Sequence, residues 1–270
     1  MKVGVFDSGL GGLTVVQSIS NIIKNVEIFY IADTINAPYG QKSVEQILDY
    51  SLKITQYLIN NYKIDALVVA CNTATSASIL QLRERYPDLI IIGTEPAVKL
   101  ALALTKTSNI GVLATPATLA GDKYQSLIDK IVTSKDISLY EQACAGLVEH
   151  IENDTLNSKE SLLLLEGWLS PMRIANVDTI VLGCTHYPLA REVIENIMNN
   201  GVRCIDSGNA IAQYLLSRLE DIGHKNIGDS ILHIFHTGEI KQLLVKKLFP
   251  QHESQYIGKI AKESLQPHEQ

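Results

Sequence analysis

The chain contains 270 residues, of which 46% are apolar and 19% charged, a composition typical of a folded globular protein and unlike that of a disordered chain. Its formal net charge is −6, from 23 basic and 29 acidic side chains, so it lacks the basic footprint of a dedicated nucleic-acid binder. No charge-free apolar stretch approaches the ~18 residues that a membrane helix needs. Polar Asp7 and Ser8 interrupt the N-terminus too early for a secretory signal. We therefore expect a cytoplasmic protein that binds neither nucleic acid nor membrane.

Short apolar runs alternate along the chain with longer amphipathic stretches. The short runs are rich in Val, Ile and Leu without strict alternation, which is typical of strands buried on both faces. They predict strands over 2–6, 27–32, 65–70, 89–93, 109–114, 137–143, 178–183, 202–206 and 231–236. The stretches between them predict helices over 12–24, 43–62, 74–85, 96–105, 117–131, 158–175, 188–199, 209–222 and 239–248, and a further helical segment that ends at Glu149-His150. This alternation predicts a mainly parallel, doubly wound α/β architecture, in which functional loops lie at the carboxyl ends of the strands.

Two segments of the chain are repeated in the same order. Residues 3–9 align with residues 110–116, and residues 65–73 align with residues 178–186, at nearly equal offsets of 107 and 113 residues. Two matches at similar offsets favour a duplicated half-domain. We therefore expect two pseudo-symmetric lobes, each with a mainly parallel sheet, and an active site in the cleft between them.

The repeat singles out two of the four cysteines. Cys71 and Cys184 follow the equivalent strands, where backbone N–H groups and a helix N-terminus lower a thiol pKa from its usual value of about 8.5. Cys144 and Cys204 have no repeat partner, and we expect them in the core. No pair of cysteines has C-x-x-C spacing. His233 and His236 lie an odd number of residues apart on a predicted strand and so point to opposite faces of the sheet. The sequence therefore predicts no metal site.

A glycine-rich loop follows the first predicted strand and opens a helix. Gly9 and Gly11 match the start of the dinucleotide fingerprint G-x-G-x-x-G, but Thr14 replaces its last glycine. Asp33 stands near the distance expected of a ribose-binding acid, whereas Asp7 places a negative charge where the pyrophosphate would approach. The loop therefore favours an acceptor for a substrate ammonium group over a nucleotide site. The next strand is followed by residues 32–40, a Pro/Gly turn or a substrate-binding loop.

Four motifs together resemble the glutamate racemase family, within the wider amino-acid racemase superfamily. They occur in the family's order and span most of the chain, at residues 5–15, 38–40, 70–74 and 182–188. The resemblance implies an isomerase that needs no cofactor and makes D-glutamate for peptidoglycan synthesis, and thus for cell wall biogenesis and cell shape. It also implies a first α/β lobe from residues 1–95 plus 208–270, a second from 96–207, and commonly a homodimer.

The resemblance assigns roles to individual residues. Cys71 and Cys184 would be the two bases, Cys71 for D-glutamate and Cys184 for L-glutamate, with Asp7 and His186 also in the catalytic set. The substrate site would be formed by Asp7, Ser8, Tyr39, Gly40, Asn72, Thr73, Thr185 and His186. Asp33 and Glu149 would lie behind these residues, although the segment 142–145 before Glu149 departs from the family pattern.

Three other functions fit part of this pattern. A racemase for aspartate or another amino acid would share both cysteines, and substrate assays separate it from a glutamate racemase. A dinucleotide-dependent oxidoreductase would use the loop from Gly9 to Thr14 and bind NAD(P)H tightly, which Asp7 argues against. A non-catalytic amino-acid-binding module would keep the pocket without needing two reactive thiols, so selective alkylation of Cys71 and Cys184 distinguishes it from an enzyme.

Overall fold

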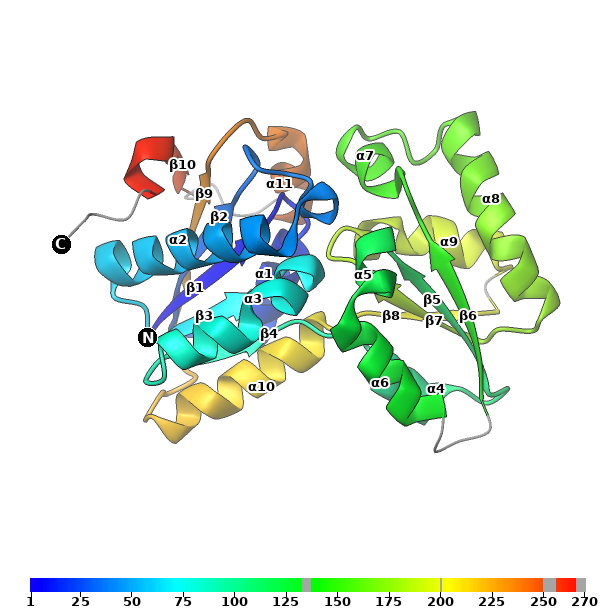
Figure 1. The fold of residues 1–270 in the computed structure, drawn as a ribbon, viewed down its shortest axis with the longest axis horizontal. Coiled ribbons are helices and arrows are strands. Elements are labelled where there is room, and N and C mark those ends of the chain that lie inside the picture. Colours follow the sequence, from blue (N-terminus) through cyan, green and yellow to red (C-terminus); the bar gives the residue numbers. More distant parts are fainter. Residues whose placement is uncertain (133–136, 200, 250–255, 266–270) are drawn as a thin grey trace. The chain divides into compact units, whose positions relative to one another are not determined.

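The computed structural model describes residues 1–132, 137–199, 201–249 and 256–265 (Figure 1). The chain divides into two compact units, Met1–Thr94 with Gly208–Gln270, and Glu95–Ser207. Each unit is an α/β body with a sheet of its own, and all strand pairs in the described residues are parallel. Within those residues no helix is long and apolar enough to cross a membrane.

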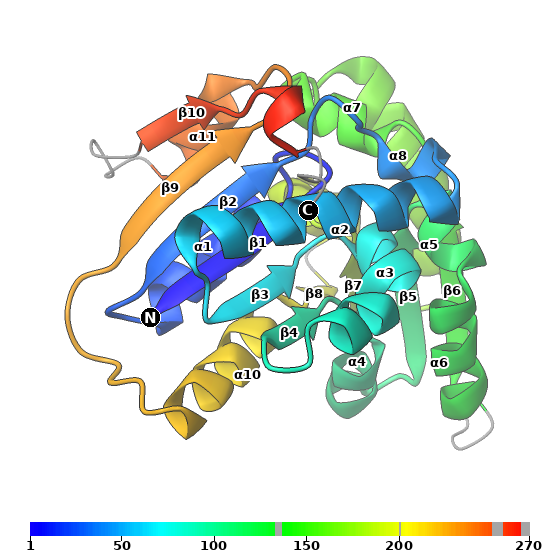
Figure 2. The ribbon, with the colours of Figure 1, turned by 60° about the vertical axis from the view of Figure 1, so that its left-hand side comes forward.

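The first unit is built on a six-stranded sheet of order β10-β9-β2-β1-β3-β4, which Figure 2 shows from β10 at its upper edge. Its strands are β1 (Lys2–Asp7), β2 (Glu27–Ala32), β3 (Ala66–Val69), β4 (Ile90–Gly93), β9 (Ile231–His236) and β10 (Tyr256–Lys259). The chain therefore returns after residue 207 to add β9 beside β2 and β10 beside β9. Strands β1, β2 and β3 are buried along nearly their whole length, as their unbroken apolar sequences predict.

The helices of the first unit cover both faces of this sheet. They are α1 (Leu13–Ile22), α2 (Val44–Tyr62), α3 (Asn72–Arg85), α10 (Gly208–Asp221) and α11 (Gln242–Leu248), with short turns η1 (Tyr39–Gln41) and η3 (Lys262–Leu265). Helix α1 packs against α10, and α2 packs against α3. Phe6 lies in a core cluster with α2 and α3, while Val5, which points to the opposite face, is also fully buried.

The second unit is built on a four-stranded sheet of order β6-β5-β7-β8. Its strands are β5 (Asn109–Ala114), β6 (Ser138–Ala143), β7 (Thr179–Gly183) and β8 (Arg203–Ile205). Its helices are α4 (Val98–Leu104), α5 (Pro116–Ala120), α6 (Asp122–Val132), α7 (Leu147–Glu152), α8 (Lys159–Ile174), η2 (Tyr187–Ala190) and α9 (Arg191–Ile197). Two separate apolar clusters, one with α4 and α6 and the other with α7, α8 and α9, show that both faces of the sheet are covered.

The two units share the same strand arrangement. The order β2-β1-β3-β4 in the first sheet corresponds to β6-β5-β7-β8 in the second. Val3 pairs with Ala66, and Ile110 pairs with Thr179. The sequence offsets of 107 and 113 residues carry the first of these pairs onto the second. The internal repeat is therefore a repeat of strand register, and the predicted doubly wound α/β class is confirmed.

Three elements differ from the predicted boundaries. The helix expected over 117–131 is two helices, because Gly121 between α5 and α6 is extended, with φ −74° and ψ 135°. The helix expected over 188–199 begins as the turn η2 and continues as α9. Glu149 lies in the first turn of α7 and not at the end of a helix. Strand β10 has no counterpart among the predicted strands.

Candidate active site

Asp7 lies at the carboxyl end of β1 and is fully buried. Its Oδ2 atom accepts a hydrogen bond of 2.8 Å from the Gly12 amide, which closes the glycine-rich loop onto the carboxylate. A Cβ atom at Gly12 would lie 2.6 Å from the Asp7 Cβ, so only glycine fits there. This use of the Gly12 amide places a carboxylate where a dinucleotide fold would place a phosphate, which argues against the nucleotide alternative.

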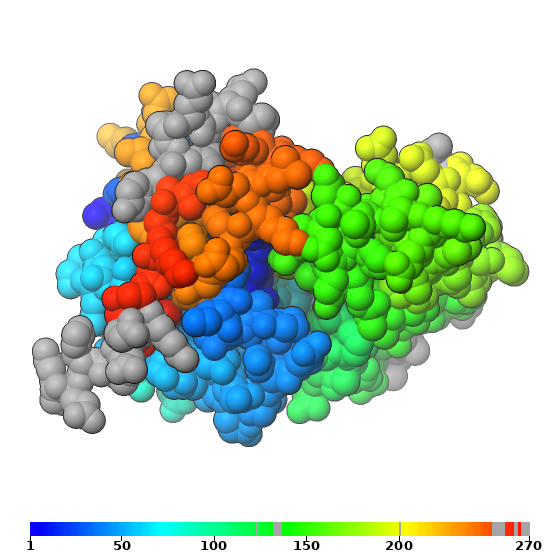
Figure 3. Space-filling model, turned by 90° about the horizontal axis from the view of Figure 1, so that it is seen from above, coloured from blue at the N-terminus to red at the C-terminus, as the bar shows by residue number. Residues whose placement is uncertain are grey.

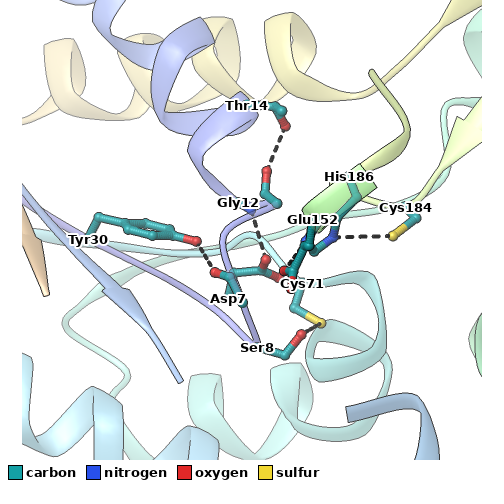
Figure 4. A network of polar contacts seen from close by, with 11 residues as sticks. Asp7, Ser8, Gly12, Thr14, Tyr30, Cys71, Glu152, Cys184 and His186 are labelled. Atoms are coloured by element: carbon teal, nitrogen blue, oxygen red, sulfur yellow. Dashed lines mark hydrogen bonds and ion pairs between the residues drawn. The ribbon is translucent and has the colours of Figure 1, made fainter. Parts of the chain in front are cut away.

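Cys71 follows β3 and is the N-cap residue of α3, in the role usually taken by Ser, Thr or Asp. The Ala74 amide donates a hydrogen bond to the Cys71 Sγ over 3.4 Å, and the Ser8 Oγ lies 3.8 Å from the same sulfur. Figure 4 shows Ser8 and Cys71 facing each other. An amide donor and the positive end of a 14-residue helix both stabilise a thiolate. Asn72 and Thr73 form the first turn of the same helix and are half-buried.

Tyr39 belongs to the loop after β2, in the turn η1, and its side chain is buried. Its hydroxyl donates to the Asp33 Oδ2 atom over 2.7 Å, and burial followed by the Asp33 charge raises the Tyr39 pKa well above its ordinary value. The phenol is therefore a neutral donor engaged by Asp33. Gly40, the next residue, is exposed. Asp33 thus contacts the buried end of the Tyr39 side chain within the first unit.

Cys184 follows β7 in the second unit and is half-buried. The Nδ1 atom of His186 lies 3.9 Å from the Cys184 sulfur, and the Nε2 atom of the same ring lies 2.9 Å from the Oε1 atom of Glu152. Figure 4 shows this chain of thiol, imidazole and carboxylate. His186 and Thr185 are both buried. The imidazole of His186 lies between the Cys184 sulfur and the Glu152 carboxylate. A carboxylate hydrogen-bonded to the imidazole in this position fixes the orientation of the ring.

Two residues of this arrangement were missed by the sequence patterns. Glu152 contacts His186, whereas Glu149, the predicted residue, has an exposed side chain one helical turn earlier on α7. Thr237 donates a hydrogen bond to Asp33 over 2.8 Å from the end of β9. A signal existed for both: Glu152 follows Glu149 at helical spacing, and Thr237 directly follows a predicted strand.

The remaining cysteines and histidines lie in other surroundings. Burial raises the pKa of Cys144 and of Cys204 to about 12 in each case. His233 pairs with Glu27 over 3.0 Å, and the Nδ1 atom of His236 lies 2.8 Å from the Gly238 carbonyl oxygen. Among the residues that the structure describes, no group of three or more His, Cys, Asp or Glu side chains is placed to hold a metal ion.

Known proteins resemble this chain along nearly all of its length. The family model for Asp/Glu/hydantoin racemases matches residues 3–215. A curated protein named glutamate racemase from Sulfurovum sp. is 56% identical over 94% of this chain and 96% of its own, and one from Aliarcobacter butzleri is 55% identical over 92% and 95%. The crystal structure of Escherichia coli glutamate racemase with L-glutamate and the activator UDP-MurNAc-Ala superimposes with a TM-score of 0.84, at 31% identity, over 96% of this chain and 98% of that one.

Proposed function

The chain belongs to the Asp/Glu/hydantoin racemase family, and from that premise we propose that it interconverts L- and D-glutamate. The relatives that match nearly its whole length are named glutamate racemases, and the Escherichia coli structure holds L-glutamate. The reaction is an isomerisation in which Cα loses a proton from one face and gains another on the opposite face. The substrate is the glutamate zwitterion with its side-chain carboxylate, and we propose that no cofactor takes part.

We propose that Cys71 and Cys184 are the two bases. Inversion at Cα requires a proton to leave one face of the carbon and another to arrive on the opposite face, which two groups do more readily than one. The observation that carries this proposal is that each cysteine stands two residues past a matching register pair, Phe6 with Val69 and Leu113 with Leu182. Duplicated halves thus supply one thiol each, and the proposal requires each sulfur to reach one face of the same Cα.

The surroundings of the two thiols fit alternating acid and base roles. One cysteine must begin as a thiolate and the other as a thiol, and the roles exchange in the reverse reaction. The Ala74 amide supports the Cys71 thiolate that would take the proton from D-glutamate. The His186 imidazole, backed by Glu152, supports the Cys184 thiolate that would take it from L-glutamate.

Residues that follow strands β1, β2, β3 and β7 would hold the substrate. Asp7 would accept the ammonium group. Hydroxyl and amide groups would bind the two carboxylates, and those aimed at the α-carboxylate would stabilise the charge that develops there in the transition state. The residues proposed for this are Ser8, Asn72, Thr73 and Thr185, together with Tyr39 and Gly40 through their backbone amides, because the Tyr39 hydroxyl donates to Asp33.

The most direct test is chiral analysis of purified protein incubated with L-glutamate and no added cofactor. We expect D-glutamate to accumulate until the two enantiomers are equal, because they have the same free energy. L-aspartate under the same conditions should stay unchanged. Racemisation of aspartate in place of glutamate would assign the protein to another substrate, and failure of a folded sample to racemise either would contradict the proposal.

We further propose that the product supplies peptidoglycan synthesis, and so cell wall biogenesis and cell shape. Growth of a bacterial strain that requires D-glutamate, after expression of this chain, would support that role, and growth that still needs added D-glutamate would oppose it. The cytoplasmic location and the homodimer remain predictions of the family resemblance. Sedimentation of the purified protein tests the dimer directly.

A further inference from the structure

The turn that follows β9 contacts the loop that carries Tyr39. Strands β2 and β9 are parallel with Ala32 opposite His236, so the next residues, Asp33 and Thr237, leave the sheet side by side. The Thr237 hydroxyl donates to the Asp33 Oδ1 atom over 2.8 Å and accepts from the Ile35 amide over 3.1 Å. One hydroxyl therefore contacts both the carboxylate and the backbone of the loop.

Asp33 connects Thr237 to Tyr39, because its carboxylate accepts a hydrogen bond from each hydroxyl. The Asp33 Oδ2 atom accepts from the Tyr39 hydroxyl over 2.7 Å, and the Asn36 side-chain amide donates to both carboxylate oxygens. Thr237, Asp33 and Tyr39 are 2%, 1% and 1% exposed, so this carboxylate depends on protein donors in place of water. Removing one buried donor leaves the charge less well satisfied and frees the loop to move.

Gly238 makes a second contact between the same two segments. Its amide donates to the Thr34 Oγ1 atom over 2.9 Å. A Cβ atom at this position would lie 3.0 Å from the Ile35 backbone nitrogen, so the two chains approach closely. Figure 3 shows the residues that follow β9, in orange, against the blue segment that contains this loop.

The loop in turn packs beside Cys71. Turn η1 contacts α3, of which Cys71 is the N-cap, and the Tyr39 ring and Cys71 belong to one core cluster. The Asp33 amide also donates to the Asp7 carbonyl oxygen over 2.9 Å. A shift of the Asp33 carboxylate would therefore also shift Tyr39, which belongs to the same core cluster as Cys71.

We propose that Thr237 is a positioning residue, which through Asp33 holds the segment from Pro38 to Gly40 in the conformation that binds the substrate carboxylate. This inference rests on the proposed function, which assigns Tyr39 and Gly40 to the substrate. It adds a residue from the C-terminal part of the chain, beyond the 3–215 match to the racemase family model.

The test compares Thr237→Val, which removes the hydroxyl and keeps the shape, with Thr237→Ser, which keeps the hydroxyl. Thr55→Val is the matched control, because Thr55 is also a fully buried threonine, and its hydroxyl donates to the Ser51 carbonyl inside α2. We expect Thr237→Val to raise KM about tenfold for both enantiomers, with a smaller change in kcat. Thr237→Ser and Thr55→Val should keep KM within about twofold of the wild type.

Hydrogen exchange of the free protein gives a readout that does not depend on activity. Amides of residues 33–42 should exchange faster in Thr237→Val than in the wild type, and Thr55→Val should leave them unchanged. Unchanged exchange in that segment, or equal KM changes in Thr237→Val and Thr55→Val, would overturn the positioning role. If Thr237→Val shows the faster exchange but the wild-type protein racemises no glutamate, the positioning contact stands and the proposed function is overturned.

Discussion

The Oε1 atom of Glu152 lies 2.9 Å from the Nε2 atom of His186, on the side of the ring opposite to the nitrogen that faces Cys184. The imidazole therefore links a carboxylate to a thiol, and the carboxylate fixes the orientation of the ring. At Cys71 the Ala74 amide donates to the sulfur, and the Ser8 hydroxyl lies 3.8 Å from it. The imidazole–carboxylate pair thus contacts Cys184, whereas Cys71 has an amide donor from the start of its own helix.

This difference predicts that Glu152→Gln changes the isotope effects for L- and D-glutamate in opposite directions. Loss of a charged hydrogen bond weakens transition-state stabilisation by roughly 1.5–3 kcal/mol, so kcat/KM should fall about ten- to a hundredfold. The fall should be equal in both directions, because the enantiomers have equal free energy. Proton removal by Cys184 should become more rate-limiting, so the primary deuterium isotope effect should grow for L-glutamate labelled at Cα and shrink for labelled D-glutamate.

Glu149→Gln tests the other carboxylate of α7, which lies one turn away with an exposed side chain and which the family resemblance also places near the site. If the contact with His186 is the one that matters, Glu152→Gln should change kcat/KM and the isotope effects more than Glu149→Gln does, and the reverse order would contradict this. Glu160→Gln is the control, because Glu160 is exposed in the first turn of α8, and it should leave both quantities close to those of the wild type.

Alkylation should distinguish the proposed bases from the other two cysteines. Burial raises the pKa of Cys144 and of Cys204 to about 12. At pH 8 only about one in ten thousand of such thiols is ionised, and the thiolate is the reactive form. Iodoacetamide should therefore modify Cys71 and Cys184 first in the folded protein, and D,L-glutamate should slow both reactions. Mass spectrometry that finds Cys144 or Cys204 modified as fast would contradict this assignment.

Asp178 offers a test of stability at the start of β7. Its Oδ1 atom accepts from the Thr105 and Thr179 hydroxyls, and its Oδ2 atom accepts from the amides of Lys106 and Thr107. An asparagine can accept on one side only, so Asp178→Asn should lower the free energy of unfolding by about 2 kcal/mol at pH 7. The repeat supplies a comparison, because Asp65 at the equivalent position accepts from the Lys2 amide on the exposed surface, and Asp65→Asn should cost less.

Asp178 should also make the free energy of unfolding depend on pH. Burial alone would raise the Asp178 pKa, but the hydrogen bonds to its carboxylate lower it below the ordinary value. A group with a lowered folded-state pKa stabilises the fold above its unfolded-state pKa, and this stabilisation is lost as the pH falls through the folded-state value. Urea unfolding should show a constant difference between wild type and Asp178→Asn from pH 7 to about pH 5, and a smaller one below about pH 3. A difference that grows in acid would contradict this reasoning.

Strands β1 to β9 and both cysteine positions could be predicted from the sequence, because these depend on local apolar runs and on an internal repeat, whereas β10 was missed. The contact between Thr237 and Asp33 could not be predicted, since it depends on β9 returning to lie beside β2, and strand order is not a local property. Glu152 was missed because the direction in which α7 leaves the sheet decides which of its carboxylates meets His186. The break at Gly121 was missed because helical apolar spacing continues across it.

We propose that two thiols, one on each face of Cα, transfer different protons, and turnover in D2O tests this mechanism most directly. Starting from L-glutamate, the D-glutamate formed early should carry solvent deuterium at Cα, and the remaining L-glutamate should be nearly unlabelled; starting from D-glutamate, the pattern should reverse. Cys71→Ala and Cys184→Ala should each abolish net racemisation, because each removes the acid or base from one face. D-glutamate that keeps its original Cα hydrogen, or full activity in either alanine variant, would contradict the two-thiol mechanism.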